Sequence, residues 1–146
     1  MERKLQISDL SIGDWVEIDG EPAKALCLRI AGGHIFKGVS GQMYRCCGGM
    51  DFEPIPITPE ILEKNGLSFK EFAFEETTML GRHIRRIAVS KSDRGWWIHV
   101  SIRKAGGHDF VDMIFAVDFI GQFVHELQHA LRLAGIDKEI ELRNAL

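Results

Sequence analysis

The sequence predicts a single α+β domain over residues 1–146, made mostly of antiparallel strands, with an SH3-like small barrel in its N-terminal region, one short helix and one long C-terminal helix. Three observations predict this class. The first third alternates apolar and polar residues in short runs between glycine turns. A helix-start signal follows, and near the end apolar residues recur at helical spacing. A length of 146 residues suits one shared core.

Residues 1–57 form the SH3-like strand region. The alternation predicts four strands, Asp14–Asp19, Ala23–Ile30, His34–Val39 and Gln42–Cys46. In the second of these, Leu26, Leu28 and Ile30 are expected to share one face, and Cys27 and Arg29 the other. Asp19 and Gly20 make a tight-turn pair between the first two strands. Short, strongly twisted strands of this kind tend to curl into a small barrel.

Residues 58–66 predict the short helix, because Thr58 can cap its start and Asn65-Gly66 can end it. Pro54, just before it, permits only an edge strand.

Residues 83–117 predict three antiparallel strands, His83–Ser90, Trp96–Arg103 and Phe110–Val117. In the middle strand Trp96 is expected in the core, whereas Trp97 lies on the other face, where residues 67–80 are expected to cover it. The third strand is almost wholly apolar, so it is expected at the centre of the sheet.

Residues 120–134 predict the C-terminal helix, closed by Gly135. Its apolar positions form one stripe, Ile120, Phe123, Val124, Leu127, Leu131 and Ala134. The helix is expected to lay Phe123, Leu127 and Leu131 on the sheet.

The charge of the chain is mild overall but uneven along it. The net charge is −3, yet the segment from Arg82 to Lys104 holds seven basic residues against one acid, Asp93. Such a segment is either a solvated hairpin or a face for nucleic acid or an acidic partner. An exposed tryptophan beside arginines can stack single-stranded nucleic acid or anchor a protein interface. The predicted binding residues are therefore Arg85, Arg86, Arg94, Trp97 and Arg103.

Cysteine usage and hydropathy favour a cytoplasmic location. The three cysteines, Cys27, Cys46 and Cys47, are odd in number and contain no CxxC pair, as expected for reduced thiols. The longest apolar run, Met113–Val117, is far shorter than a membrane span, and the chain starts without a secretion signal. No membrane partner is expected.

The string HELQH near the end matches HExxH, the zinc motif of many hydrolases. On a helix His125 and His129 lie one turn apart, so both could bind one zinc ion while Glu126 acts as the general base. A third ligand is missing from the usual places, although Glu139 is available, and a metzincin would have histidine where this chain has Gly135. A zinc-dependent hydrolase is therefore the alternative, and no cofactor is expected.

Three stretches, IGDWVEIDGEPAKAL, EPIPITPEILEKNG and FVHELQHALRLAGIDKEIEL, resemble a family of small uncharacterised proteins from gut bacteria and their phages and mobile elements. The family's closing motif is VHxLQ, often VHQLQN, with an amide at the positions of Glu126 and His129. The resemblance implies that Val124, His125, Leu127 and Gln128 form a packing signature and that the zinc pair is not a family property.

These observations together predict an accessory protein of phage or mobile-element type, acting as a non-enzymatic binding module through its basic hairpin. The expected partner is an unknown protein or a nucleic acid, and a homodimer is possible. A nucleic-acid binder further requires the predicted arginines to converge on one face with Trp97.

Overall fold

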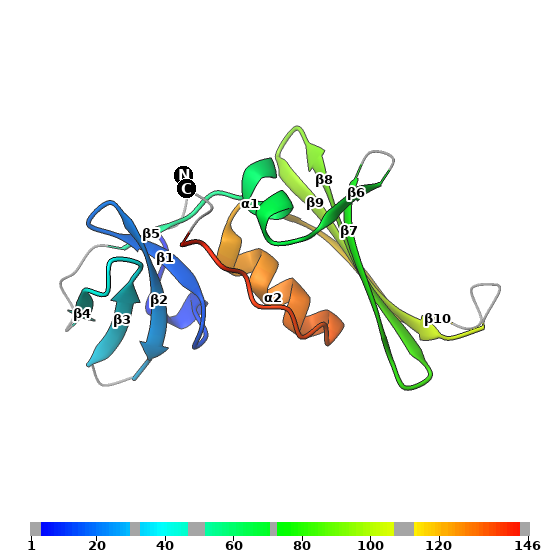
Figure 1. The fold of residues 1–146 in the computed structure, drawn as a ribbon, viewed down its shortest axis with the longest axis horizontal. Helices are drawn as coiled ribbons and strands as arrows, with labels where there is room; N and C mark the ends of the chain where they lie inside the picture. Colours follow the sequence, from blue (N-terminus) through cyan, green and yellow to red (C-terminus); the bar gives the residue numbers. More distant parts are fainter. Residues whose placement is uncertain (1–3, 30–32, 47–51, 71–72, 107–112, 144–146) are drawn as a thin grey trace. The chain divides into compact units, whose positions relative to one another are not determined.

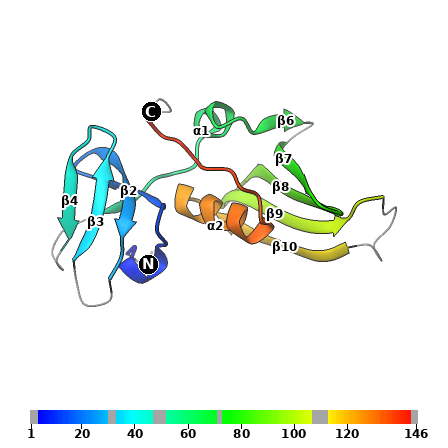
Figure 2. The same cartoon turned by 60° about the horizontal axis from the view of Figure 1, so that its bottom comes forward.

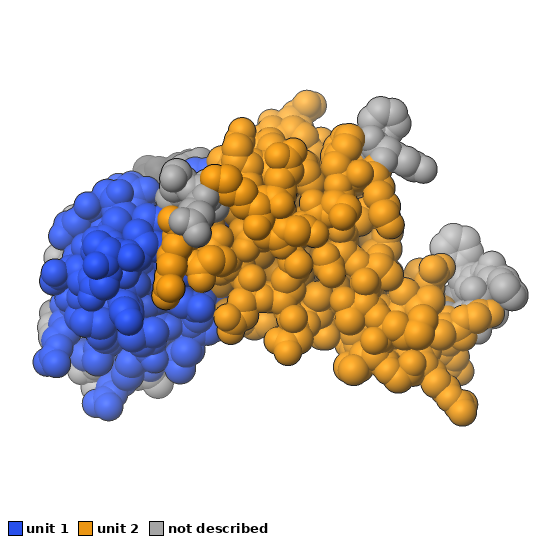
Figure 3. Space-filling model, in the orientation of Figure 1, with its two compact units in different colours: residues 1–56, 123–125 blue, residues 57–122, 126–146 orange. Residues whose placement is uncertain are grey.

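The computed structural model describes residues 4–29, 33–46, 52–70, 73–106 and 113–143 (Figure 1). The chain is α+β, as predicted, with mostly antiparallel strands, a short helix and a C-terminal helix. It divides into two compact units, residues 1–56 with 123–125 and residues 57–122 with 126–146 (Figure 3). Each unit contains one five-stranded antiparallel sheet. That both units form a single folding domain stays a prediction.

The first unit holds the predicted SH3-like strand region. After a short 3-10 helix, η1 (Ile7–Asp9), come β1 (Trp15–Ile18), β2 (Glu21–Cys27), β3 (His34–Gly38), β4 (Met43–Cys46) and β5 (Glu53–Pro54). The strand order is β4-β3-β2-β1-β5, so the chain meanders through four strands and β5 returns to pair with β1. At the β1–β2 turn Asp19 and Gly20 both have positive φ, 51° and 80°, as a two-residue hairpin turn requires.

The core of the first unit comes from its own strands and the segments that flank them. Its buried apolar side chains are Leu10, Val16, Ile18, Ala23, Ala25, Phe36, Tyr44 and Phe52. The predicted shared face of Leu26 and Leu28 is wrong, because Leu26 is 44% exposed whereas Leu28 packs against the core; Ile30 lies outside the described residues. Ala23 and Ala25 point inward in regular alternation, and a register shift between Ala25 and Cys27 then breaks the alternation, so that Leu28 returns to the edge of the core.

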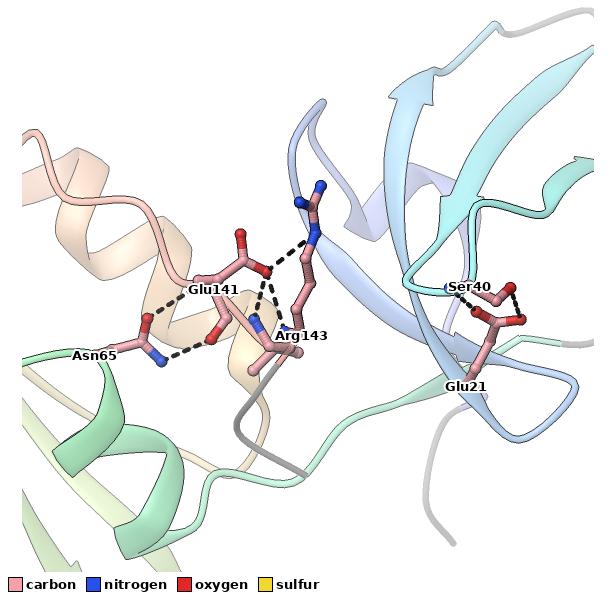
Figure 4. A network of polar contacts seen from close by, with 6 residues as sticks. Glu21, Ser40, Asn65, Glu141 and Arg143 are labelled. Atoms are coloured by element: carbon pink, nitrogen blue, oxygen red, sulfur yellow. Dashed lines mark hydrogen bonds and ion pairs between the residues drawn. The ribbon is translucent and has the colours of Figure 1, made fainter.

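A polar network holds the β3–β4 turn of the first unit against β2 (Figure 4). The Glu21 carboxylate accepts hydrogen bonds from the Tyr44 hydroxyl at 2.6 Å, the Ser40 amide at 2.9 Å and the Ser40 hydroxyl at 2.8 Å. The Tyr44 bond, followed by the two Ser40 bonds, lowers the pKa of Glu21, and the bond to Glu21 raises the pKa of Tyr44 to about 12.

The second unit is an open sheet with helices. It contains α1 (Pro59–Lys64), β6 (Ser68–Lys70), β7 (Ala73–Leu80), β8 (His83–Ser92), β9 (Gly95–Lys104) and β10 (Met113–Gly121), with the strands ordered β10-β9-β8-β7-β6. The capped short helix is as predicted, with the Thr58 hydroxyl accepting from the Ile61 amide. The predicted cover of Trp97 by residues 67–80 is wrong for the part that the structure describes, because residues 68–70 and 73–80 form β6 and β7 of the same sheet.

Two further predictions for the second unit are wrong. The apolar third strand, β10, lies at the edge of the sheet and is largely exposed, not central; the first residues of its predicted range, 110–112, lie outside the described part. Its apolar run reflects an uncovered edge, which the sequence pattern does not distinguish from a buried strand. The C-terminal helix α2 (Val124–Ala134) begins later than predicted, because Ile120 pairs with Trp97 inside β10.

The helix α2 buries the stripe that the sequence predicts. Leu127 is 0% exposed and Leu131 is 1% exposed, whereas Phe123 is half-buried and forms a bridge with Pro56. No helix in the described part of the chain is long and apolar enough to cross a membrane.

One face of the second sheet carries the helices. Its central residues, Ile87, Val89, Ile98 and Val100, are fully buried. On this helix-side face α1 is attached through the Trp96 indole, which donates to the Ile57 carbonyl at 3.0 Å, and α2 lies alongside β8 to β10 (Figure 2).

Residues 135–143, the described part of the chain after α2, form no strand, and the apolar residues Ile136, Ile140 and Leu142 are buried. The Asn65 amide clamps this tail: it donates to the Glu141 carbonyl at 3.0 Å and accepts from the Glu141 amide at 2.7 Å (Figure 4). A side chain thus pairs with the tail as a neighbouring strand would.

Candidate interaction surface

The HELQH string lies in the first half of α2, and its residues have structural contacts. His125 is only 6% exposed, and its ring stacks on Phe123 with centroids 6.0 Å apart. The Glu126 carboxylate accepts a hydrogen bond from the Gln122 amide at 3.0 Å, just before the helix begins. This side-chain bond satisfies a main-chain amide immediately before the start of the helix.

The remaining members of the proposed zinc set are a further residue of α2 and a residue of the tail. His129 is half-buried one turn further on, and Glu139 lies in the tail after the helix. Among the described residues no group of three histidine, cysteine, aspartate or glutamate side chains is arranged to hold a metal ion. Gln128, by contrast, is 7% exposed, so the buried positions are those of the VHxLQ pattern.

The seven basic residues of the hairpin are divided between different surfaces. Arg85 lies on the helix-side face, where its guanidinium donates to the Ala134 carbonyl at 2.9 Å. A side chain at Gly135 would collide with this guanidinium, because its Cβ would lie 2.2 Å from Nη1. Arg85 therefore caps the negative end of α2.

The opposite face of the second sheet, here called the open face, carries Trp97. That side chain is 40% exposed, stacks on His99 with centroids 5.8 Å apart, and lies opposite Ile120 of β10. The His99 ring in turn contacts the Asp118 carboxylate through Nδ1. Arg86 shares this face but is tied to Glu75.

The other two predicted arginines lie at opposite ends of the hairpin. Arg94 is in the β8–β9 turn, where its carbonyl accepts from the Gln122 side chain at 2.9 Å. Arg103 lies near the far end of β9, six residues beyond Trp97, a distance of roughly 20 Å along a strand. The convergence of Arg85, Arg86, Arg94 and Arg103 with Trp97 does not occur.

The far end of the sheet instead gathers a different set of residues, here called the basic tip. It comprises Met79, Leu80, Arg82, Arg103 and Lys104. All five are exposed, Met79 by 63% and Leu80 by 57%. Arg82, Arg103 and Lys104 make no ion pair with any residue that the structure describes.

The register of the strands brings these five residues to the same end of the sheet, with Met79 and Arg103 on the open face and Leu80 and Lys104 on the helix-side face. In one cross-strand row Met79 and Arg103 flank Ile84 of β8. In the next row Leu80 and Lys104 flank His83 of β8. Arg82 lies in the β7–β8 turn, and its carbonyl accepts from the Ala105 amide at 2.7 Å. Neighbouring strands are about 4.8 Å apart, so the members of each row lie within roughly 10 Å.

Sequence reasoning finds part of this surface and misses the rest. Arg103 is among the predicted binding residues, and Arg82 and Lys104 belong to the basic segment. The sequence pattern does not reveal Met79 and Leu80, because it does not identify residues 67–80 as strands. The signal is weak: β7 reads AFEETTML, where two glutamates and two threonines interrupt the apolar pattern.

A pocket of about 610 Å³ in the same unit has an aromatic wall. Phe69, Phe74 and Trp96 line it, and the Lys91 ammonium lies 4.9 Å from the centroid of the Trp96 ring. Glu60 also lines it, so charges of both signs are present, and they favour no single class of ligand.

Comparison of the chain with protein-family models, with curated proteins and with solved structures finds no match.

Proposed function

We propose that this chain is a non-enzymatic binding module whose basic tip holds an acidic, apolar-containing segment of a partner protein. The observation that carries the proposal is the presence, at one end of one sheet, of three exposed basic residues and two large exposed apolar residues, with one basic and one apolar strand residue on each face. Exposed apolar side chains rimmed by polar residues are typical of protein interaction sites, and a basic rim selects acidic partners.

A nucleic acid is the less favoured partner. Sequence-tolerant binding of single strands uses aromatic platforms beside basic residues. At the basic tip the apolar residues are aliphatic, Met79 and Leu80, whereas Trp97 lies about six residues away along β9. Arg86 is neutralised by Glu75 and Arg85 caps a helix, which leaves fewer cations for a phosphate backbone.

The same proposal includes a cytoplasmic accessory role of the phage or mobile-element type. Cys27 is a free, half-buried thiol, as a reducing compartment favours. The resemblance in the VHxLQ helix remains the reason for the accessory role.

Peptide-display selection on the purified chain tests the proposal directly. Selected peptides are expected to combine Asp or Glu with Leu, Ile or Phe, and their affinity should fall as salt rises. Replacing both Arg103 and Lys104 by Glu should weaken the best peptide about tenfold or more. The matched control is Arg94→Glu, an exposed arginine at the other end of the hairpin, which should leave the affinity unchanged.

A parallel binding experiment with nucleic acid distinguishes a protein partner from a nucleic-acid partner. Labelled single-stranded and duplex oligonucleotides are added at low salt to the same protein. Oligonucleotide binding that is tighter than peptide binding and falls steeply with salt would replace the proposal by nucleic-acid recognition. Selection of peptides without acidic residues, or equal loss in both charge-reversed proteins, would also overturn it.

A further inference from the structure

The edge strand β10 presents a hydrogen-bonding edge nine residues long with which no described strand pairs. It ends the order β10-β9-β8-β7-β6, so within the described chain it pairs on one side only. The other edge of this sheet, β6, has only three residues. A long exposed edge is a template for pairing with another strand.

The usual devices that block such an edge are nearly absent from β10. Residues Met113–Gly121 contain no lysine, arginine or proline. The single charged side chain, Asp118, is tied to His99 of the neighbouring strand. The only register irregularity lies between Met113 and Phe115, at the start of the strand. The rest is regular, and Ile120 is 42% exposed.

We infer that a second copy of this chain covers the outer edge of β10, with the two β10 strands antiparallel and related by a twofold axis at Val117. This surface is separate from the basic tip, so the inference goes beyond the proposed function. A closed twofold contact uses the same patch on both copies, and an antiparallel strand pair satisfies that requirement.

The sequence of β10 is complementary to itself in this register. With Val117 on the axis, Phe115 lies opposite Phe119 of the second copy, and Ala116 lies opposite its Asp118. Ile120 comes opposite Ile114 of the second copy, and both are exposed in the single chain, by 42% and 53%. Cross-strand apolar pairs of this kind stabilise a sheet.

Other registers fit less well. An axis at Asp118 would place the two carboxylates directly opposite each other, which is destabilising. An axis at Phe119 would shorten the overlap to the last five residues of the strand, and an axis at Phe115 would fall at the register shift. The axis at Val117 uses the whole strand and opposes no like charges.

Two substitutions of opposite charge at one exposed position, Ala116, test both the contact between the copies and its register. Ala116→Asp would oppose Asp118 of the second copy twice, whereas Ala116→Lys would give each Asp118 a cation. Sedimentation velocity over a concentration series should show that the unmodified chain forms a dimer. The dimerisation affinity of Ala116→Asp should be about tenfold lower. Ala116→Lys should bind equally or more tightly. Because Ala116 is exposed, both variants should keep the thermal midpoint of the unmodified monomer.

Disulfide capture gives an independent readout. On mild oxidation, Val117→Cys should form a disulfide that joins the two copies through position 117, identified by mass spectrometry of the linked peptides, because residues on the axis lie within disulfide reach. Ile120→Cys is the matched control and should not link to itself. A monomer at every concentration, equal weakening by both Ala116 variants, or linkage at position 120 but not 117 would overturn the inference. An extended segment of another protein would then be the occupant of the edge.

Discussion

The two sheets of this chain bury their apolar faces in different ways. The first sheet has five short strands, and its core is filled by β1 to β4 together with flanking residues such as Leu10 and Phe52. The second sheet has strands of up to ten residues and stays open, so one face needs helices and a tail to cover it. An open sheet therefore leaves its second face, its edge strand and its end available for binding. The basic tip and the outer edge of β10 both belong to this second sheet.

Substitutions at the adjacent residues Trp96 and Trp97 test whether the two faces of the second sheet differ in burial. Trp96 is 5% exposed and its indole donates to the Ile57 carbonyl, so Trp96→Ala should lower the free energy of unfolding by about 3–5 kcal/mol. Trp97→Ala, on the open face, should cost about 1 kcal/mol or less. Urea unfolding followed by circular dichroism measures both. Equal losses would show that the open face is covered.

The same substitution at two arginines separates a structural cation from one available for binding. Arg85→Met removes the hydrogen bond to the Ala134 carbonyl at the C-terminal end of α2 and should cost about 1–3 kcal/mol. Arg103→Met, at the basic tip, should change stability by about 0.5 kcal/mol or less. Thermal unfolding of the two proteins at one pH compares them. A larger loss at position 103 would contradict the assignment.

The side-chain clamp on the tail should contribute less than the helix cap. Asn65→Ala removes two hydrogen bonds to the Glu141 main chain and is expected to cost about 1–2 kcal/mol. Hydrogen exchange of the Glu141 amide should accelerate in the same protein. Asn65→Asp keeps the acceptor for that amide and should therefore protect it better than alanine does. Unchanged exchange in Asn65→Ala would contradict the clamp.

The smallest effect is expected in the first sheet, at the surface network of Glu21. The hydrogen bonds from Tyr44 and Ser40 lower the pKa of this carboxyl below its ordinary 4.5. Their contribution to stability is therefore present above pH 4.5 and is lost as the pH falls through the lowered pKa. The raised pKa of Tyr44 acts at the other end: stability is retained below pH 10 and declines as the pH rises toward 12.

Carboxyl-carbon NMR titration checks this network. Tyr44→Phe should raise the pKa of Glu21 toward 4.5, because the hydroxyl bond is its largest cause. Ser40→Ala removes one bond of the three and keeps the amide bond, so it should raise the pKa of Glu21 by less. A Glu21 pKa that is the same in Tyr44→Phe as in the unmodified chain would rule out the hydroxyl bond as the cause.

The sequence by itself determined the elements whose signals are local. The Asp19-Gly20 turn, the Thr58 cap and the alternation of Trp96 with Trp97 all depend on neighbours within a few residues, and the structure places them as predicted. The stripe of Leu127 and Leu131 on α2 follows from helical spacing for the same reason.

The tertiary structure alone decided which apolar strand is covered and which cations remain available. The apolar run in β10 is compatible with a central strand and with an edge strand. The sequence pattern records hydrophobicity and carries no information on which strands are neighbours. Arg85 and Arg86 are adjacent in sequence, yet strand alternation sends one to cap α2 and the other to Glu75 on the opposite face. The binding surface therefore depends on long-range pairing, which brings Met79 and Leu80 of β7 into rows with Arg103 and Lys104 of β9.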